Sequence, residues 1–376
     1  MPRLVLVLNT GSSTVKYRLL EPATGRRLVE GTEERVENPA AAVDRVLDGI
    51  RPQLEAEQRV AAVGHRVVHG GGRFTAPTVV DDDVLAAIDE LAVLAPLHNP
   101  AAAAGIRAAR ASLPGIPQVA VFDTAFHASL PLPAATYAVP KQWRERHGVR
   151  RYGFHGTNYA HVTKEAARLL GRDVTDVDLI ALHLGNGASA CAVRGGASVD
   201  TSMGLTPLAG LVMGTRSGDV DPSVPGYLGR AAGLDPEEVD DALEHRSGLL
   251  ALAGVSDMRD LLARRTDGDD DAALAFDTYC YRVRSYIGAY LAVLGRIDAI
   301  VFTAGVGEHA AAVRAAVLAG LDGFGITLDA DRNTVSSQEA RFVSAAGAAV
   351  AVLVIPADEE LEIGRQALAA VERRNA

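Results

Sequence analysis

Two arginine residues lie in glycine-rich segments, where small neighbours allow a side chain to approach a ligand closely. Arg66 precedes the Gly70–Gly72 run in GHRVVHGGGRF, and Arg216 lies between Gly214 and Gly218 in MGTRSGD. A guanidinium group is permanently charged, and its planar fork matches carboxylate and phosphoryl oxygens. Either arginine alone could equally form an ordinary salt bridge, but the pair points to an anionic substrate.

Three glycine-containing turns each follow an apolar segment: NTGSS at residues 9–13, LGNGAS at 184–189 and TAGVGEH at 303–309. Glycine permits unusual φ angles and close approach, so such turns can present backbone N–H groups to phosphate oxygens. The sequence contains no GK dipeptide and therefore no Walker A loop. Three such turns, two of them with a hairpin pattern, predict a nucleotide held between two domains, as in the actin-like ATPase fold.

These turns need strands and helices to position them. Residues 4–20 read as a hairpin, in which LVLVL is a buried strand and alternation in TVKYRLL places Thr14 and Lys16 on one face. Residues 178–193 repeat this pattern, which suggests two related halves. Residues 298–309 give a third strand with a glycine turn, and helices are expected after residue 81, after 101 and over 269–295. Alternating strands and helices predict an α/β protein.

Composition limits the class of protein. A chain of 376 residues favours two domains, and we expect them to comprise residues 1–127 with 360–376, and residues 128–359. The net charge of −10 argues against a nucleic-acid partner. The apolar runs are too short to span a membrane, and two cysteines give no disulfide framework. We therefore expect a soluble, cytoplasmic protein.

Nine motifs in order closely resemble those of acetate kinases, from Leu4 to about Glu362. They are NTGSSTVKY, GHRVVHGG, PLHNP, VFDTAFH, RRYGFHGT, HLGNGAS, DTSMGLTPLAGLVMGTRSGDVDP, AGVGE and IPADEEL. The resemblance implies a two-domain actin-like ATPase fold of duplicated RNase H-like halves, with the nucleotide in the interdomain cleft. It also implies Mg²⁺-dependent transfer of the ATP γ-phosphoryl group to acetate, giving acetyl phosphate and ADP. Mn²⁺ is an alternative metal, and a homodimer is the implied assembly.

The resemblance assigns roles residue by residue. The implied catalytic residues are Arg66, Asp123, His155 and Arg216, of which His155 and Arg216 stabilise the transition state. The implied acetate pocket consists of Arg66, Val68, Leu97, Phe154 and Pro207. The implied metal residues are Asn9 and Glu359. The implied ATP-binding residues are Ser12, Thr14, Lys16, His183, Gly185, Asn186, Gly187, Asp257, Arg259, Gly305, Gly307 and Glu308.

The chemistry of a carboxylate substrate constrains these roles. A simple carboxylic acid has a pKa of about 4 to 5 and is ionised at pH 7, so direct in-line transfer needs no general base. Asp123 is therefore expected to organise magnesium or a cationic side chain. The main obstacle is repulsion between two anions, roughly 4 kcal/mol at about 4 Å and an effective dielectric constant near 20. We expect Arg66 and Arg216 to offset it.

Several alternatives stay open. Propionate or butyrate could replace acetate, because one methylene changes binding by only about 1–3 kcal/mol. A non-catalytic actin-like nucleotide switch would need the phosphate loops but not the paired arginines. A sugar kinase would use Asp123 as a base, which the central motif does not favour. The sequence has Asn158-Tyr159 where the family usually has Ser-His, which leaves a supporting contact to His155 open, and His309 where the family usually has Asn, which leaves the nucleotide base preference open. The direction of flux is open as well.

Overall fold

The computed structural model describes residues 3–11, 14–36, 38–50 and 59–375, and the chain forms two compact units. Unit 1 comprises residues 1–128, 154–161 and 358–376, and unit 2 comprises residues 129–153 and 162–357. Residues 154–161, which follow the expected domain boundary near residue 127, pack with unit 1. No helix in the described part of the chain is long and apolar enough to cross a membrane.

Unit 1 is built on a six-stranded sheet with the order β3-β2-β1-β4-β6-β5. Its strands are β1 (Arg3–Thr10), β2 (Thr14–Glu21), β3 (Arg26–Glu34), β4 (Arg59–Val67), β5 (Thr78–Val79) and β6 (Gln118–Phe122). β1 pairs antiparallel with β2 and parallel with β4, which confirms the predicted hairpin. Side chains of β1 alternate between two cores, with Leu4, Leu6 and Leu8 on one face and Val5 and Val7 on the other. The predicted buried strand is thus confirmed.

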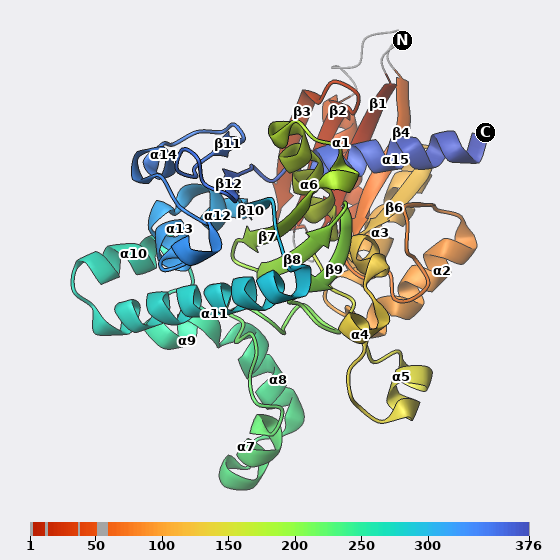
Figure 1. Ribbon diagram of the computed structural model, residues 1–376. Coiled ribbons are helices and arrows are strands. Elements are labelled where there is room, and N and C mark those ends of the chain that lie inside the picture. The colour runs from red at the N-terminus through yellow and green to blue at the C-terminus, as the bar shows by residue number, and fades with distance from the viewer. Residues whose placement is uncertain (1–2, 12–13, 37, 51–58, 376) are drawn as a thin grey trace. The chain divides into compact units, whose positions relative to one another are not determined.

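Helices cover both faces of the unit 1 sheet (Figure 1). They are α1 (Pro39–Ile50), α2 (Asp82–Glu90), α3 (Asn99–Ser112) and α15 (Glu359–Asn375), with the short 3₁₀ segment η2 (Leu91–Val93). α1 and α3 pack on the face of Leu4, Leu6 and Leu8, whereas α15 contributes Ile363 and Ala367 to the face of Val5 and Val7. Both faces of the central strands are therefore excluded from water.

Unit 2 repeats this architecture with the sheet order β11-β12-β10-β7-β8-β9. Its strands are β7 (Asp178–Leu184), β8 (Ala188–Arg194), β9 (Ala197–Thr201), β10 (Ala299–Thr303), β11 (Arg341–Phe342) and β12 (Ala351–Val354). As in unit 1, a three-stranded antiparallel meander, here β7 to β9, adjoins parallel strands, here β10 and β12. The predicted duplication is confirmed at the level of strand topology.

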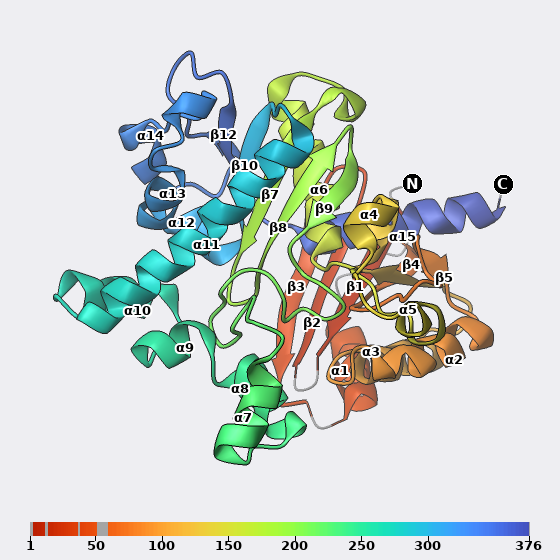
Figure 2. The ribbon, with the colours of Figure 1, turned by 60° about the horizontal axis from the view of Figure 1, so that its bottom comes forward.

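One long helix, α11 (Asp270–Leu294), packs on β8 and contacts α9, α10 and α13 (Figure 2). Asp269 caps its first turn and Gly295 ends it, so the predicted helix is confirmed. The remaining α-helices are α4 (Leu132–Ala135), α5 (Lys141–His147), α6 (Gly156–Leu170), α7 (Val224–Ala232), α8 (Pro236–His245), α9 (Gly248–Ala253), α10 (Met258–Thr266), α12 (Ala304–His309), α13 (Ala311–Leu318) and α14 (Ala330–Thr334). The remaining 3₁₀ segments are η3 (Ala125–Ser129), η4 (Val174–Asp176) and η5 (Asp322–Phe324).

The third glycine turn differs from the prediction. Residues 304–309 form the short helix α12 directly after β10, where the sequence indicated a turn. Ala304 starts this helix at a φ of 63°, a left-handed conformation that costs energy for a residue with a Cβ. The glycines of AGVGEH suggested a turn because glycine weakens helices, but helical hydrogen bonding prevails here.

Candidate active site

Three charged residues of unit 1 meet where strands β4 and β6 end. Arg66 is the penultimate residue of β4, Asp123 follows β6 directly, and Glu359 begins α15. Gly64 of β4 and Val121 of β6 lie on the face of the sheet that α15 covers. Side chains two residues apart on a strand share a face, so Arg66 and Asp123 point to this face as well. The Asp123 N–H donates to the Val67 carbonyl at 3.0 Å, which fixes the carboxylate beside the end of β4.

Arg66 and Asp123 form a bidentate ion pair. Nη2 of Arg66 donates to Oδ2 of Asp123 at 2.6 Å, and Nε lies 3.1 Å and 3.2 Å from the two carboxylate oxygens. Nε also lies 3.7 Å from Oε2 of Glu359. The side chain of Asp123 is 1% exposed, while that of Arg66 is 22% exposed. Arg66 is therefore held in a fixed orientation and keeps part of its surface available to a ligand.

The pKa values of this cluster reflect the surrounding charges. Burial alone would lower the pKa of the Arg66 guanidinium, but the negative charges of Asp123 and Glu359 outweigh it and raise that pKa above its ordinary value. Burial raises the pKa of the Glu359 carboxyl; Arg66 opposes this shift, and the charge of Asp123 adds to it. A further cation at this point would favour the ionised form of Glu359.

Asn9 and Lys16 lie on the same face of the unit 1 sheet, near the end of β1. They are paired directly across the β1–β2 hairpin, and Asn9 continues the alternation of Val5 and Val7. Lys16 is exposed, and Thr14, two residues away, shares its face. Ser12 lies outside the described residues. Unit 1 thus brings together Asn9, Lys16, Arg66, Asp123 and Glu359, whose oxygen and nitrogen donors suit Mg²⁺ and phosphate.

The turn that precedes α6 is fixed against Asp123. His155 adopts a φ of 57°, which is strained for a residue other than glycine. The Gly156 N–H donates to the Asp123 carbonyl at 2.9 Å, and a Cβ on Gly156 would lie 2.2 Å from that oxygen. The Thr157 hydroxyl donates to Oδ1 of Asp123 at 3.2 Å. We did not predict a role for Thr157 because its partner lies 34 residues earlier in the chain.

Asn99, which sequence reasoning also left without a role, holds the loop after β4. Its side-chain oxygen accepts from the His69 N–H at 3.1 Å, and its amide nitrogen donates to the His69 carbonyl at 3.0 Å. The buried Phe154 ring packs edge-on against the His69 ring. Asn99 is the asparagine of the PLHNP motif, but the motif alone does not reveal its hydrogen bonds to the main chain of His69.

The expected acetate pocket draws on both units. Val68 is partly exposed, Leu97 is exposed and Phe154 is buried in unit 1, whereas Pro207 belongs to unit 2. The pocket therefore stays a prediction.

Unit 2 contains a cavity of about 420 Å³ that is lined in part by residues expected to bind ATP. Its walls come from the β7–β8 loop, the start of α10, the start of α12 and the buried side of α11. They include Gly185, Asn186, Leu249, Asp257, Met258, Arg259, Leu262, Tyr279, Gly305 and His309. Five residues expected to bind ATP are thus brought together with an apolar floor, the combination typical of small-molecule sites.

Asp257 and Arg259 are tied together at the rim of this cavity. Asp257 caps α10, and its carboxylate accepts three hydrogen bonds from the Arg259 guanidinium, the shortest being 2.6 Å from Nη2. Hydrogen bonds from the side chain and backbone of Arg259 lower the pKa of Asp257 to about 2. Asp257 is therefore ionised throughout the neutral pH range and keeps Arg259 at the rim.

Gly307 and Glu308, also expected to bind ATP, do not line the cavity. Gly307 is buried, and the Glu308 carboxylate accepts from the Ala357 N–H at 3.0 Å. The fully buried Arg314 donates to the carbonyls of Gly307 and Glu308 at 2.8 Å and 2.9 Å. His183, in β7, is buried next to Thr303 of β10. Arg314 thus holds the end of α12, a role that the sequence did not indicate.

Arg216 lies in unit 2 within a tightly bonded loop. Its Nε lies 3.5 Å from Oε1 of Glu244, and its Nη1 lies 3.5 Å from the Pro207 carbonyl. Gly214 donates to the Asn186 carbonyl at 2.9 Å, so this loop is bonded to the β7–β8 loop that lines the cavity. Arg216 resembles Arg66 in being partly exposed and oriented by a carboxylate.

Comparison with known proteins identifies the family. A model of the acetokinase family matches residues 32–365. The chain belongs to the acetokinase family. It is 54% identical over 396 aligned positions to the acetate kinase of Streptomyces avermitilis, covering 98% of each chain. It is 51% identical to the acetate kinase of Streptomyces coelicolor, covering 98% of this chain and 97% of the relative.

Solved structures of the acetokinase family share this fold. The crystal structure of Porphyromonas gingivalis acetate kinase matches with a TM-score of 0.93 and 38% identity, covering 98% of this chain and all of that one. A propionate kinase from Francisella tularensis matches with a TM-score of 0.91 and 38% identity, covering 97% and 98%. The predicted two-domain, actin-like ATPase fold is thereby confirmed.

Proposed function

We propose that this acetokinase-family chain catalyses the reversible transfer of the ATP γ-phosphoryl group to acetate, giving acetyl phosphate and ADP. The observation that carries the proposal is the Arg66 fork, held by Asp123 beside Glu359 at the strand edge where the first phosphate loop emerges. An oriented, partly exposed guanidinium suits an anionic substrate that must approach a polyanion. Similarity to acetate kinases over nearly the whole chain supports the choice of acetate.

The proposed mechanism is direct in-line transfer without a general base. Acetate is already ionised at neutral pH, so Asp123 serves to hold Arg66, and the residues that matter most are those that offset charge repulsion. We propose that Arg66 from unit 1 and Arg216 from unit 2 contact the transferring group, with His155 donating a hydrogen bond to it. The predicted division into residues 1–127 with 360–376 and residues 128–359 stays a prediction, and it differs from the two compact units in the placement of residues 128, 154–161 and 358–359.

The residues of unit 1 fit a hard divalent cation. Asn9 and Glu359 offer oxygen donors, and Mg²⁺ is usually held by one or two carboxylates together with substrate phosphates. When bound, Mg²⁺ or Mn²⁺ would neutralise charge on the β- and γ-phosphates. Asn9 and Glu359 would hold the metal, partly through water, while Lys16 and Thr14 would bind phosphate oxygens.

The test is to trap the acyl phosphate. The chain is incubated with ATP, Mg²⁺, acetate and hydroxylamine, and acetohydroxamate is measured. Rapid formation that depends on both acetate and Mg²⁺ supports the proposal. ATP hydrolysis without hydroxamate would contradict it and would favour a nucleotide switch.

Propionate is the second candidate, because a propionate kinase is among the similar solved structures. Comparing kcat/KM for acetate, propionate and butyrate distinguishes the two. A preference for propionate over acetate would replace the first proposal.

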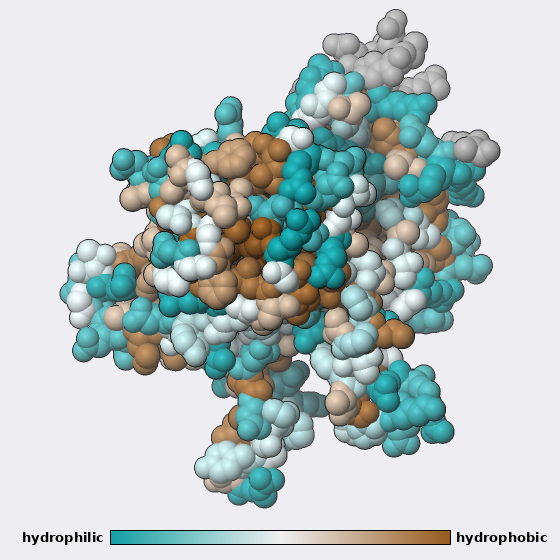
Figure 3. All heavy atoms as spheres, viewed as in Figure 1, coloured by the Kyte–Doolittle hydropathy of each residue, from teal (hydrophilic) through white to brown (hydrophobic). Residues whose placement is uncertain are grey.

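A homodimer and a cytoplasmic location complete the proposal. Unit 2 exposes apolar side chains on α11, namely Leu274, Tyr281 and Val293. Figure 3 shows apolar side chains among the polar ones over this part of unit 2. A second copy of the chain would remove such side chains from water. Sedimentation equilibrium that gives a single-chain mass at micromolar concentration would contradict the dimer.

A further inference from the structure

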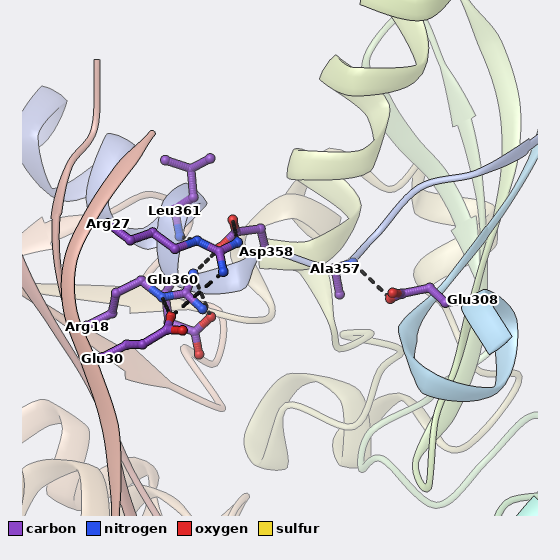
Figure 4. A network of polar contacts seen from close by, with 8 residues as sticks. All are labelled: Arg18, Arg27, Glu30, Glu308, Ala357, Asp358, Glu360 and Leu361. Atoms are coloured by element: carbon purple, nitrogen blue, oxygen red, sulfur yellow. Dashed lines mark hydrogen bonds and ion pairs between the residues drawn. The ribbon is translucent and has the colours of Figure 1, made fainter. Parts of the chain in front are cut away.

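The chain passes from unit 2 to unit 1 between Ala357 and Asp358, and each of these residues is bonded within its own unit. In unit 2, the Glu308 carboxylate accepts from the Ala357 N–H at 3.0 Å. In unit 1, Asp358 pairs with Arg18 and with Nη2 of Arg27, the latter at 2.9 Å. Figure 4 shows these contacts on either side of the peptide bond that joins the two residues.

The unit 1 contacts also fix the start of α15. Oδ1 of Asp358 accepts from the Leu361 N–H at 3.2 Å, as a helix-capping residue does. Arg18 additionally pairs with Glu30 at 2.9 Å and with Glu360 at 3.5 Å. The residue between Asp358 and Glu360 is Glu359, whose carboxylate lies 3.7 Å from Arg66. Two peptide bonds therefore connect residue 357 to the proposed metal residue, Glu359.

In unit 2, the residue that bonds Ala357 belongs to α12, the helix that lines the proposed nucleotide cavity. Gly305, Val306 and His309 of α12 line this cavity, while Glu308, on the same short helix, faces Ala357. Arg314 donates hydrogen bonds to the carbonyls of Gly307 and Glu308. These bonds fix the main chain that carries the Glu308 side chain. A ligand in the cavity would therefore contact the same short helix whose Glu308 bonds Ala357.

We propose that Glu308 is a positioning residue, not a nucleotide ligand: its carboxylate couples the nucleotide-lining helix α12 to the segment that presents Glu359. The proposal deepens the proposed function, because the role of Glu359 as a metal residue belongs to that function. The hydrogen bond to Ala357 is charge-assisted, and such bonds are roughly twice as strong as neutral ones. Losing it should loosen residue 357 without removing any contact to the cavity.

The experiment compares Glu308→Met, which keeps the length of the side chain but removes the acceptor, with Glu308→Gln, which keeps an acceptor oxygen. Both variants lose the charge, so they differ chiefly in the hydrogen bond. Glu339→Met, at an exposed site in unit 2, is the matched control. Amide hydrogen exchange is measured on peptides that span residues 353–360, with and without saturating Mg-ADP.

We expect the Ala357 amide to exchange about tenfold faster in Glu308→Met, and within about threefold of the parent in Glu308→Gln and Glu339→Met. Mg-ADP should slow this exchange in the parent and in Glu308→Gln but not in Glu308→Met. In turnover, Glu308→Met should lower kcat by about tenfold and raise the Mg²⁺ concentration for half-maximal rate, with little change in ADP affinity.

Two results would overturn the proposal. One is parent-like exchange at Ala357 in Glu308→Met, and the other is equal slowing by Mg-ADP in all the variants. A tenfold weaker ADP affinity in both Glu308 variants would return Glu308 to the nucleotide ligands. If the parent failed to form acetyl phosphate, the proposed function would be refuted. The positioning role of Glu308 would still be tested, because the exchange measurement does not depend on catalysis.

Discussion

Replacing Arg66 by alanine separates its role in catalysis from its role in stability. Removing one unit charge about 4 Å from the transferring group forfeits roughly 4 kcal/mol at an effective dielectric constant near 20. Since about 1.4 kcal/mol corresponds to a tenfold change in rate, kcat should fall by about 10³-fold. Lysine should recover only part of this loss, because it keeps the charge but lacks the fork.

The same substitution leaves the buried Asp123 carboxylate without its main partner. Breaking a buried pair costs about 3–5 kcal/mol, and we expect less, about 1–3 kcal/mol, because Arg66 is 22% exposed and water can enter. The double variant Arg66→Ala with Asp123→Asn removes the orphaned charge, so it should regain stability without regaining activity. Stability is measured by urea denaturation and activity by acetohydroxamate formation. Turnover of Arg66→Ala within tenfold of the parent would refute the reasoning.

Three further predictions concern other parts of the molecule. Arg216→Ala should lower kcat by about 10³-fold with little change in stability, because its partner Glu244 is itself partly exposed; a normal kcat would remove Arg216 from the mechanism. Gly156→Ala should lower both stability and kcat, because its Cβ would meet the Asp123 carbonyl, whereas the control Gly49→Ala, with open space around it, should be neutral or stabilising in denaturation assays. Burial lowers the pKa of His65 to about 4, so the unfolded chain binds more protons between pH 6.5 and 4 and stability falls as pH falls. Between pH 7 and 5 this loss should be about 2 kcal/mol in urea titrations, and His65→Gln should lose correspondingly less.

Much of the fold could be predicted because local patterns determined it. The LVLVL strand is buried on both faces, and the helix from Asp270 to Leu294 has an acidic cap and a terminal glycine, signals that depend only on neighbours in sequence. α12 was not predicted, because its two glycines indicate a turn and only packing in the folded chain favours a helix there.

The site could be predicted in part. Motif resemblance indicated Arg66, Asp123 and Glu359, and the structure brings these residues together from three elements. It did not assign a role to Asn99, Thr157 or Arg314, because each acts through partners defined by the tertiary fold. The strained φ of His155 likewise has no signal in sequence, since a histidine gives no hint of a left-handed backbone.

The most direct test of the central claim is a crystal structure with Mg-ADP, acetate and a planar mimic of the transferring phosphoryl group. We predict that the guanidinium groups of Arg66 and Arg216 both lie within about 3 Å of the mimic's equatorial atoms, with Glu359 on the metal side. A structure in which either guanidinium points away from the mimic would contradict the account.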